Sequence, residues 1–323
     1  MDDEARANSS LRVASMFAGI GGICLGFKQV DCEIVWANEI NDAACRTYVH
    51  NFGSRYLVPG DIKRIVAASI PDCDILAAGF PCQSFSASGA QRGFNDRRGR
   101  LFFEVARIAK EKRPPVLFLE NVDNLLDHDS GRTLQIIYAE LAQLGYAVRY
   151  KIMPSNKYGG LPQPRKRVYL VAFLDWEKCR RFQFPEPLPL KKTIFDVINL
   201  NDKKNEIYYL PVDSDLARRA AQAIDEPQYV YRVFDGKITK LKNRLAPTLT
   251  ASMVSLDNTA VVKDAYGIRR LTLRECLAFQ GFPEAFYFPN TITLEDAYKQ
   301  IGNSVSVPVI KRIAENLVQV LIP

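Results

Sequence analysis

Two residue types that could act together in catalysis each follow an apolar run of the sequence. Cys82 lies in the turn Gly79-Phe-Pro-Cys-Gln83 after the run 74–78, and Glu120 follows the run 116–119. Apolar runs of this length are typical of buried parallel strands, and catalytic groups gather at the carboxyl ends of such strands. If the two strands are neighbours, a thiol and a carboxyl group face one pocket. A lone cysteine is otherwise more often an inert buried residue.

The beginning of the chain has a second chemical pattern. A predicted strand at 11–17 is separated from a predicted helix by three glycines: Gly19, Gly21 and Gly22. Such a turn lets the backbone approach a nucleotide-like cofactor. Glu39 lies two residues beyond the next predicted strand, 33–37, where a carboxylate can hold both hydroxyls of a ribose. Asp61 could accept a hydrogen bond from an adenine amino group, and a helix-capping role fits it equally well.

Basic residues accompany both patterns. The segment 84–99 combines three glycines, several hydroxyl side chains and three arginines, a composition that suits either a mobile loop over a phosphate backbone or a plain surface loop. Arg165 and Arg167 are two residues apart, so in an extended strand they lie on the same face. They could bind phosphate or a carboxylate, or form a solvated edge.

The order of the predicted elements indicates an α/β fold, since strands and helices alternate through the first half of the chain. From about residue 184 the composition changes to a polar module with short β-like runs at 229–234 and 248–250, joined by a proline-rich linker. Thr272 and Glu275 predict a capping box at the beginning of a later helix.

Composition limits the class of protein. The 323 residues are 47% hydrophobic, enough for a full core, and the net charge of +7 with a pI near 9.0 favours a polyanionic partner. The seven cysteines are odd in number and form no CxxC pair, which argues against a zinc site or a disulfide framework and for a reducing compartment. No run approaches the roughly 20 apolar residues of a membrane span, so we expect a cytoplasmic protein.

Taken together, the motifs resemble those of the cytosine-C5 DNA methyltransferases of bacterial restriction-modification systems. They occur in the family's order: Phe17-Ala-Gly-Ile-Gly-Gly22, Asn38-Glu39, Gly60-Asp-Ile62, Gly79 to Gln83, Glu120-Asn-Val122, Gln163 to Arg167, Arg270 to Pro283 and Gly302-Asn-Ser304. The resemblance implies an S-adenosylmethionine-dependent, Rossmann-like catalytic domain of residues 1–185 plus 284–323. It also implies a smaller, mostly β or irregular target-recognition domain of residues 186–283.

The resemblance further implies the reaction. A methyl group would pass from S-adenosylmethionine to C5 of a cytosine flipped out of a short specific duplex DNA sequence, leaving S-adenosylhomocysteine and using no metal. Cys82 would bond covalently to C6, and Glu120 would bind N3. Arg165 and, in a more structural role, Arg167 would fix O2 of the base and the carboxylate. Methylation would protect the DNA from a cognate restriction endonuclease.

The motif matches also imply the binding residues. Those for the cofactor are Phe17, Gly19, Gly21, Gly22, Glu39, Asp61, Ile62, Pro81, Asn303 and Ser304, and those for DNA are Ser88, Arg98 and Thr248. A monomer that acts on double-stranded DNA is expected. Two departures concern the loop after Thr248, where 250–254 lacks the glycines of some relatives, and Ile40, where some members have an aromatic residue. The base-reading residues of 186–283 therefore do not transfer.

Several other classes of protein share part of this pattern. A nicotinamide-dependent Rossmann enzyme would leave Cys82 and Glu120 without a role, and amino-methylating DNA enzymes carry a Pro-Pro-aromatic turn in place of Pro81-Cys82. An RNA cytosine-C5 methyltransferase and a catalytically inactive DNA-binding relative stay open. The sizeable module after residue 184 favours duplex DNA, and the presence of Cys82, Glu120 and Arg165 favours an enzyme.

Overall fold

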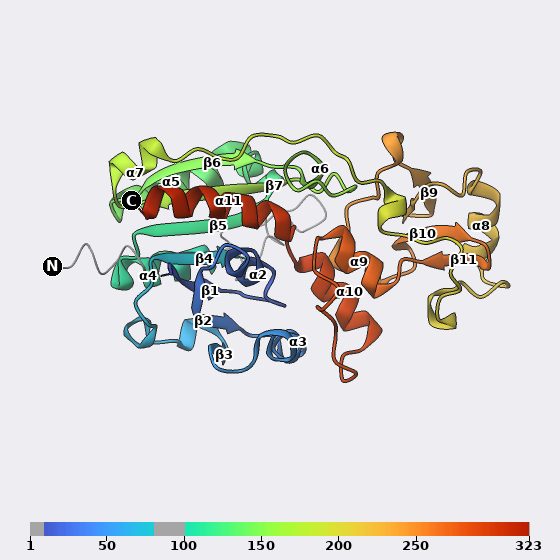
Figure 1. The fold of residues 1–323 in the computed structure, drawn as a ribbon, viewed down its shortest axis with the longest axis horizontal. Coiled ribbons are helices and arrows are strands. Elements are labelled where there is room, and N and C mark those ends of the chain that lie inside the picture. The colour runs from blue at the N-terminus through green and yellow to red at the C-terminus, as the bar shows by residue number, and fades with distance from the viewer. Residues whose placement is uncertain (1–9, 81–100, 323) are drawn as a thin grey trace. The chain divides into compact units, whose positions relative to one another are not determined.

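The computed structural model describes residues 10–80 and 101–322, which form two compact units (Figure 1). The first unit is drawn from residues 1–153, 166–186 and 309–323, and the second from residues 154–165 and 187–308. The predicted α/β fold class is confirmed. The boundaries expected for the catalytic and target-recognition domains remain a prediction. In the division by contacts, residues 154–165 and 284–308 belong to the second unit.

The first unit is built on a seven-stranded sheet with the order β3-β2-β1-β4-β5-β7-β6. Neighbours from β3 to β5 pair in parallel, whereas β7 runs antiparallel to both β5 and β6. The strands are β1 (Arg12–Met16), β2 (Glu33–Glu39), β3 (Leu57–Pro59), β4 (Ile75–Gly79), β5 (Val116–Val122), β6 (Ala147–Ile152) and β7 (Arg167–Phe173). The carboxyl ends of β1, β2, β4 and β5 therefore share one edge.

Helices cover both faces of this sheet. Successive side chains of β5 point to opposite faces and so pack into two different cores. Phe118 packs edge-on against Phe27 of α2, with ring centroids 5.3 Å apart, whereas Leu117 joins a core formed with α4 and α5. Gly26 lets α2 lie close to α11, since a Cβ there would be 2.5 Å from Ile310. The helices are α2 (Gly22–Lys28), α3 (Asp42–Phe52), α4 (Leu101–Lys112), α5 (Arg132–Gln143), α7 (Trp176–Arg181) and α11 (Val307–Leu321).

The second unit contains a four-stranded antiparallel sheet with the order β11-β10-β8-β9. Helix α8 packs on one face of it through Ala217 and Ala220, which meet Tyr231 and Val261. The elements are α6 (Ser155–Tyr158), α8 (Asp215–Ala223), β8 (Tyr231–Phe234), β9 (Lys237–Lys240), β10 (Asn258–Asp264), β11 (Gly267–Arg270), α9 (Leu273–Phe279) and α10 (Leu294–Asn303).

Short 3₁₀ helices complete both units. They are η1 (Ile62–Arg64), η2 (Ala67–Ser69), η4 (Asp123–Leu125), η5 (His128–Gly131), η6 (Ile194–Asp196), η7 (Glu206–Tyr208), η8 (Lys242–Arg244) and η9 (Ala251–Val254). Residues 248–250 were predicted as β-like, and this was wrong. The reason is that side chains bind the backbone of Leu249: its N–H donates to Gln163 and its carbonyl accepts from Arg165.

A buried arginine joins two strands to a helix in the second unit. Arg269 of β11, 0% exposed, donates to Asp264 at 2.6 Å and to both carboxylate oxygens of Glu275 at 2.8 Å. Glu275 also accepts from the N–H of Thr272, which confirms the predicted capping box of α9. Since charges buried this deeply are stabilised mainly by one another, the network fixes α9 against the sheet.

Replacing Arg269 by Met should therefore destabilise the protein by about 3–5 kcal/mol, because two carboxylates would stay buried without their cation. The shift in the midpoint of urea unfolding measures this cost. The matched control is Arg232→Met, which removes an exposed guanidinium 4.4 Å from the ring centre of Phe234 and should cost under about 1 kcal/mol. Equal midpoints for the two variants would contradict the structural role of Arg269.

Candidate active site

The carboxyl end of β4 lies directly beside that of β5. The two strands pair in parallel, and Gly79 is aligned with Glu120, so the condition set for a shared pocket, that the two strands are neighbours, is met. Phe80 is buried, and Asn121 donates to its carbonyl oxygen at 3.2 Å, which fixes the backbone just before Pro81. Four residues of the predicted site lie outside the described residues: Pro81, Cys82, Ser88 and Arg98.

Glu120 is paired with an arginine from the antiparallel strand β7. Nε of Arg167 lies 3.1 Å from Oε1 of Glu120, and the two side chains are only 14% and 10% exposed. The other carboxylate oxygen lies on the β4 side, since a Cβ at Gly79 would be 3.5 Å from Oε2. A nearly buried carboxylate needs such a charged partner, so the pair holds Glu120 in one orientation at the edge of the sheet.

Arg165 occupies a different environment from Arg167. It precedes β7 and belongs to the second unit, where its guanidinium donates to the backbone carbonyls of Leu249, Gly302 and Ser304. Arg165 lies outside β7, so the shared face that an extended strand would give these two arginines is not formed. It is Arg167, which the sequence had assigned the more structural role, that contacts Glu120.

The turn after β1 meets the carboxylate at the end of β2. Oε2 of Glu39 accepts from the N–H of Gly19 at 2.8 Å, and Oε1 accepts from the N–H groups of Ile40 at 2.9 Å and Asn41 at 2.8 Å. Phe17 has a φ of 53°, a strained value for a residue with a side chain, and such strain is concentrated at functional sites. Gly19 borders open space, since a Cβ there would meet no atom within 4 Å.

The tip of β3 is held against β2 by Asn38. Its amide donates to the carbonyls of Val58 at 2.9 Å and Gly60 at 3.0 Å. Asp61 follows and caps η1 by accepting from the N–H of Lys63, which bears out the capping interpretation of Asp61. Asn38 and Asn121 were in the matched motifs but had been given no role. The signal in the sequence was an amide side chain directly after an apolar run. Such a group is buried at the end of a strand, and a buried amide must find a hydrogen-bond partner.

The remaining predicted residues lie at ends of helices or beside them. Gly21 is the N-cap of α2 with a φ of 87°, and a Cβ there would be 2.3 Å from the ring of Phe52. Gly22 begins the same helix, and Ile62 is buried in the core of the first unit. In the second unit Asn303 ends α10, Ser304 is its C-cap and Thr248 precedes Leu249.

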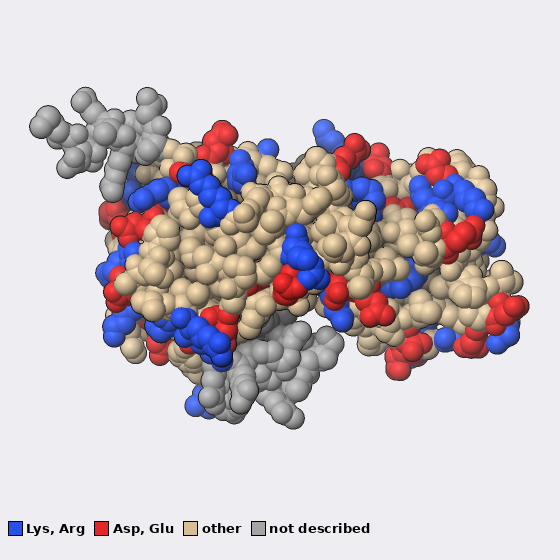
Figure 2. Space-filling model, turned by 90° about the horizontal axis from the view of Figure 1, so that it is seen from below, with Lys and Arg blue, Asp and Glu red and all other residues tan. Residues whose placement is uncertain are grey.

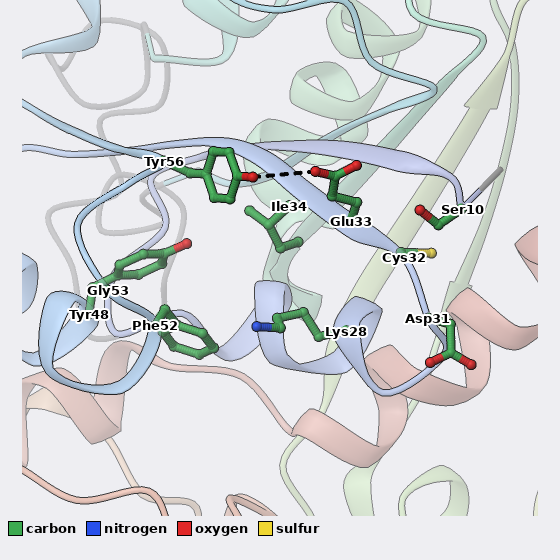
Figure 3. Close-up of a pocket in the computed structure, with 10 residues that line it drawn as sticks. All are labelled: Ser10, Lys28, Asp31, Cys32, Glu33, Ile34, Tyr48, Phe52, Gly53 and Tyr56. Atoms are coloured by element: carbon green, nitrogen blue, oxygen red, sulfur yellow. Dashed lines mark hydrogen bonds between the residues drawn. The ribbon is translucent and has the colours of Figure 1, made fainter.

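A cavity of about 360 Å³ lies elsewhere in the first unit, between α2, α3 and the beginning of β2 (Figure 3). Tyr56 donates to Glu33 there at 3.4 Å, and the ammonium of Lys28 lies 5.7 Å from the ring centre of Phe52. Its lining contains none of the described residues that were predicted to bind the cofactor. Because Glu33 begins β2 and Glu39 ends it, this cavity lies toward the opposite end of the strand from the candidate site.

Charged side chains of both signs lie on the surface of the protein. Lysine and arginine side chains are interspersed with acidic ones on the face drawn in Figure 2, so the excess positive charge is not gathered in one patch there.

Within residues 10–80 and 101–322, no three His, Cys, Asp or Glu side chains form a group that could hold a metal ion. No helix in these ranges is long and apolar enough to cross a bilayer.

These features define a class of fold. A largely parallel sheet covered on both faces, a glycine turn after its first strand and a carboxylate ending its second are shared by enzymes that bind nucleotide-like cofactors, and S-adenosylmethionine-dependent methyltransferases are among them. The chain matches the model of the C-5 cytosine-specific DNA methylase family over residues 11–319. The protein therefore belongs to this family and is a DNA (cytosine-5)-methyltransferase, which confirms the resemblance of its motifs.

Individual relatives agree with the family match. The chain is 43% identical over 311 residues to the type II methyltransferase M.Bsp6I of Bacillus sp. (strain RFL6), covering 95% of this chain and 98% of the relative. It is 36% identical over 318 residues to the type II methyltransferase M.HhaI of Haemophilus parahaemolyticus, covering 96% and 94%.

Solved structures support the fold. A DNMT2 mutant from Spodoptera frugiperda has a TM-score of 0.74 at 21% identity, covering 95% of this chain and 99% of that one. The methyltransferase EhMeth of Entamoeba histolytica has a TM-score of 0.72 at 21% identity, covering 97% and 99%. At this identity the likeness concerns the fold alone.

The cysteines of the described residues are all buried, and burial suppresses their reactivity. Burial raises the pKa of Cys32 and Cys73 to about 12 and that of Cys45 to about 11. It also raises the pKa of Cys24, Cys179 and Cys276. Because the thiolate is the reactive form, none of these thiols is suited to act as a nucleophile near neutral pH.

Brief treatment of the native protein with iodoacetamide at pH 8 should therefore spare the six described cysteines, and Cys82, as the predicted nucleophile, should take the label. A thiol of pKa 12 is only about one part in 10,000 thiolate at that pH. Peptide mass spectrometry gives the labelled site, and Cys82→Ser should remove the label. Labelling of Cys32 or Cys73 without unfolding would show that their burial does not persist in solution.

Proposed function

We propose that the protein methylates C5 of a cytosine flipped out of a short specific duplex sequence, through a covalent bond between Cys82 and C6 of the base. Membership of the cytosine-C5 family supports the reaction. The observation that carries the residue assignments is the alignment of Gly79 with Glu120 across β4 and β5. Cys82 follows Gly79 by three residues, so the nucleophile and the acid come from adjacent strand ends.

Cys82 is the nucleophile in this proposal because C5 of cytosine is too weakly nucleophilic to take a methyl group directly. The thiolate bonds to C6, and the electrons of the C5–C6 double bond become available at C5. After the methyl group has been added, water or hydroxide removes the C5 proton, the double bond re-forms and the bond to sulfur breaks. An ordinary thiol is only a few per cent thiolate at neutral pH, so the site must favour the ionised form.

Glu120 and Arg167 would act on the base as one unit. Glu120 would bind N3 and the exocyclic amine, and a proton held at N3 would stabilise the adduct as C6 is attacked. The 3.1 Å contact with Arg167 orients Oε1, while Oε2 lies on the Gly79 side. We assign the contact with O2 of the base to Arg167, because it already lies beside Glu120.

S-adenosylmethionine supplies the methyl group when it is bound, and the described residues fit it. Oε2 of Glu39 carries one backbone hydrogen bond, so it retains acceptor capacity for the ribose hydroxyls. The open space at Gly19 admits a ligand close to the backbone. Phe17, Gly21, Gly22, Asp61, Ile62, Pro81, Asn303 and Ser304 complete the proposed set from their motif matches.

Duplex DNA is the proposed substrate, with DNA contacts drawn from residues 186–283, Thr248 among them. Ser88 would enter the duplex and Arg98 would contact a phosphate. Extrusion of the base costs a few kcal/mol of stacking, which contacts of this kind must offset. The net charge of +7 supports binding to a polyanion.

The biological role would be protection of DNA in a restriction-modification system. The names of the relatives, which are type II methyltransferases, support this assignment. We expect a monomer that works in the cytoplasm and is linked to a cognate endonuclease by function rather than by physical association.

The function is tested by methyl transfer from labelled S-adenosylmethionine to plasmid DNA, followed by bisulfite sequencing. Methylcytosine should appear within one recurring short motif. Cys82→Ser should abolish transfer and leave the affinity for S-adenosylmethionine within a few-fold, because Phe17, Glu39 and Asp61 are unchanged. Transfer to RNA but not to DNA would overturn the substrate. Binding to a 5-fluorocytosine duplex without covalent trapping would indicate an inactive relative.

The pairing of Arg167 with Glu120 gives a second test. Arg167→Lys should lower kcat by about 100-fold, since a lysine cannot reproduce the oriented guanidinium contact, which acts where charge develops on the base. Cofactor affinity should stay near the wild-type value, as the pair is separate from Glu39. Lys166→Met changes the exposed neighbour and should leave kcat unchanged. A normal kcat for Arg167→Lys would rule out a role beside the base.

A further inference from the structure

Arg165 ties together two segments that are distant from it and from each other in the sequence. The side chain is 1% exposed, and its guanidinium donates to the carbonyl of Leu249 at 2.6 Å and to that of Gly302 at 3.1 Å. It also donates to the carbonyl of Ser304. These acceptors lie 84, 137 and 139 residues along the chain, so one side chain sets their mutual positions.

The partners of Arg165 explain why an arginine is needed. Gly302 is in the last turn of α10. Carbonyl oxygens in the last turn of a helix accept no hydrogen bond from an N–H of the helix itself, and they carry partial negative charge. A planar guanidinium presents several N–H groups in a fixed fork, so it can serve a helix end and a neighbouring chain at once. Hydrogen bonds from a charged donor are also stronger than those from a neutral one.

Gln163 supports the same arrangement from two residues away. It is 0% exposed, and its amide oxygen accepts from the N–H of Leu249 at 3.0 Å while its nitrogen donates to the carbonyl of Phe279 at 3.1 Å. The N–H of Ala246 donates to the carbonyl of Pro162 at 2.8 Å. Residues 162–165 therefore fix both polar backbone groups of Leu249.

The two segments also touch each other directly. A Cβ at Gly302 would lie 2.1 Å from the backbone nitrogen of Ala251 and 2.1 Å from the carbonyl carbon of Thr250. Only a glycine permits this approach, since both contacts are with backbone. A movement of the end of α10 toward residues 250–251 therefore must displace them as well.

We propose that Arg165 is a positioning residue that holds the loop after Thr248 and the end of α10 in one geometry, and so couples DNA recognition to cofactor binding. This rests on the proposed function, which gives Thr248 to DNA and Asn303 and Ser304 to the cofactor. Arg165 then acts on both ligands through the backbone it fixes, and it makes no contact with the cytosine itself.

Arg165→Lys tests the proposal, because a single ammonium cannot replace three contacts of a planar fork. Hydrogen–deuterium exchange should increase in both 246–251 and 301–306 and stay unchanged in β1 and β4. Affinity for S-adenosylhomocysteine and affinity for duplex DNA, each measured alone, should both fall by about tenfold, as expected when hydrogen bonds to a charged group are lost. Lys166→Arg, an exposed change in the same segment that keeps the charge, should alter none of these values.

Three outcomes would overturn the proposal in distinguishable ways. Unchanged exchange in either segment would show that Arg165 does not hold the two together. A fall in kcat with both affinities unchanged would place Arg165 at the base, as its motif match implied. Increased exchange in both segments with normal affinities would show that Arg165 holds the segments but that they do not set ligand binding. It would overturn the ligand roles assigned to Thr248, Asn303 and Ser304, and would leave the proposed chemistry of Cys82 untouched.

Gly302→Ala provides an independent variant if Arg165→Lys fails to fold. The added Cβ pushes residues 250–251 from the end of α10 and leaves the side chain of Arg165 in the sequence. The same joint increase in exchange and joint loss of both affinities would support the coupling. Loss of one affinity alone would contradict it.

Discussion

The parallel pairing of β4 with β5 is the constraint on which the rest of the candidate site depends. It aligns Gly79 with Glu120, and the absence of a side chain at Gly79 leaves room beside the carboxylate. Both strands are buried on two faces by helices, so their register is fixed by packing rather than by the polar groups they carry. The apolar core on both faces of β4 and β5 therefore sets the positions of the groups at the ends of these strands.

One reversal of strand direction gives this carboxylate its partner. β7 runs antiparallel beside β5, so its first residue, Arg167, lies opposite Val122 and within 3.1 Å of Glu120. A parallel strand in this place would deliver its first residue to the other edge of the sheet. The antiparallel insertion therefore allows an arginine at the beginning of one strand to meet an acid at the end of another.

Much of the fold was predictable from local pattern. Unbroken apolar runs marked β4 and β5, the glycine turn marked the junction of β1 and α2, and Thr272 with Glu275 marked the beginning of α9. These signals succeed because each depends on residues close in sequence. Residues 248–250 failed the same test, since the partners of Leu249 are side chains of Gln163 and Arg165 rather than a neighbouring strand.

The sequence by itself determined which residue types are available for chemistry, the order of the motifs and hence the family. The resemblance gave the more structural role to Arg167, but the sequence could not decide this point, because two arginines at a spacing of two are equivalent in any local pattern. Only the tertiary structure decided that Arg167 contacts Glu120 and that Arg165 binds the carbonyls of Leu249, Gly302 and Ser304. The physical reason is that a hydrogen bond depends on distance in space, and chain folding sets that distance.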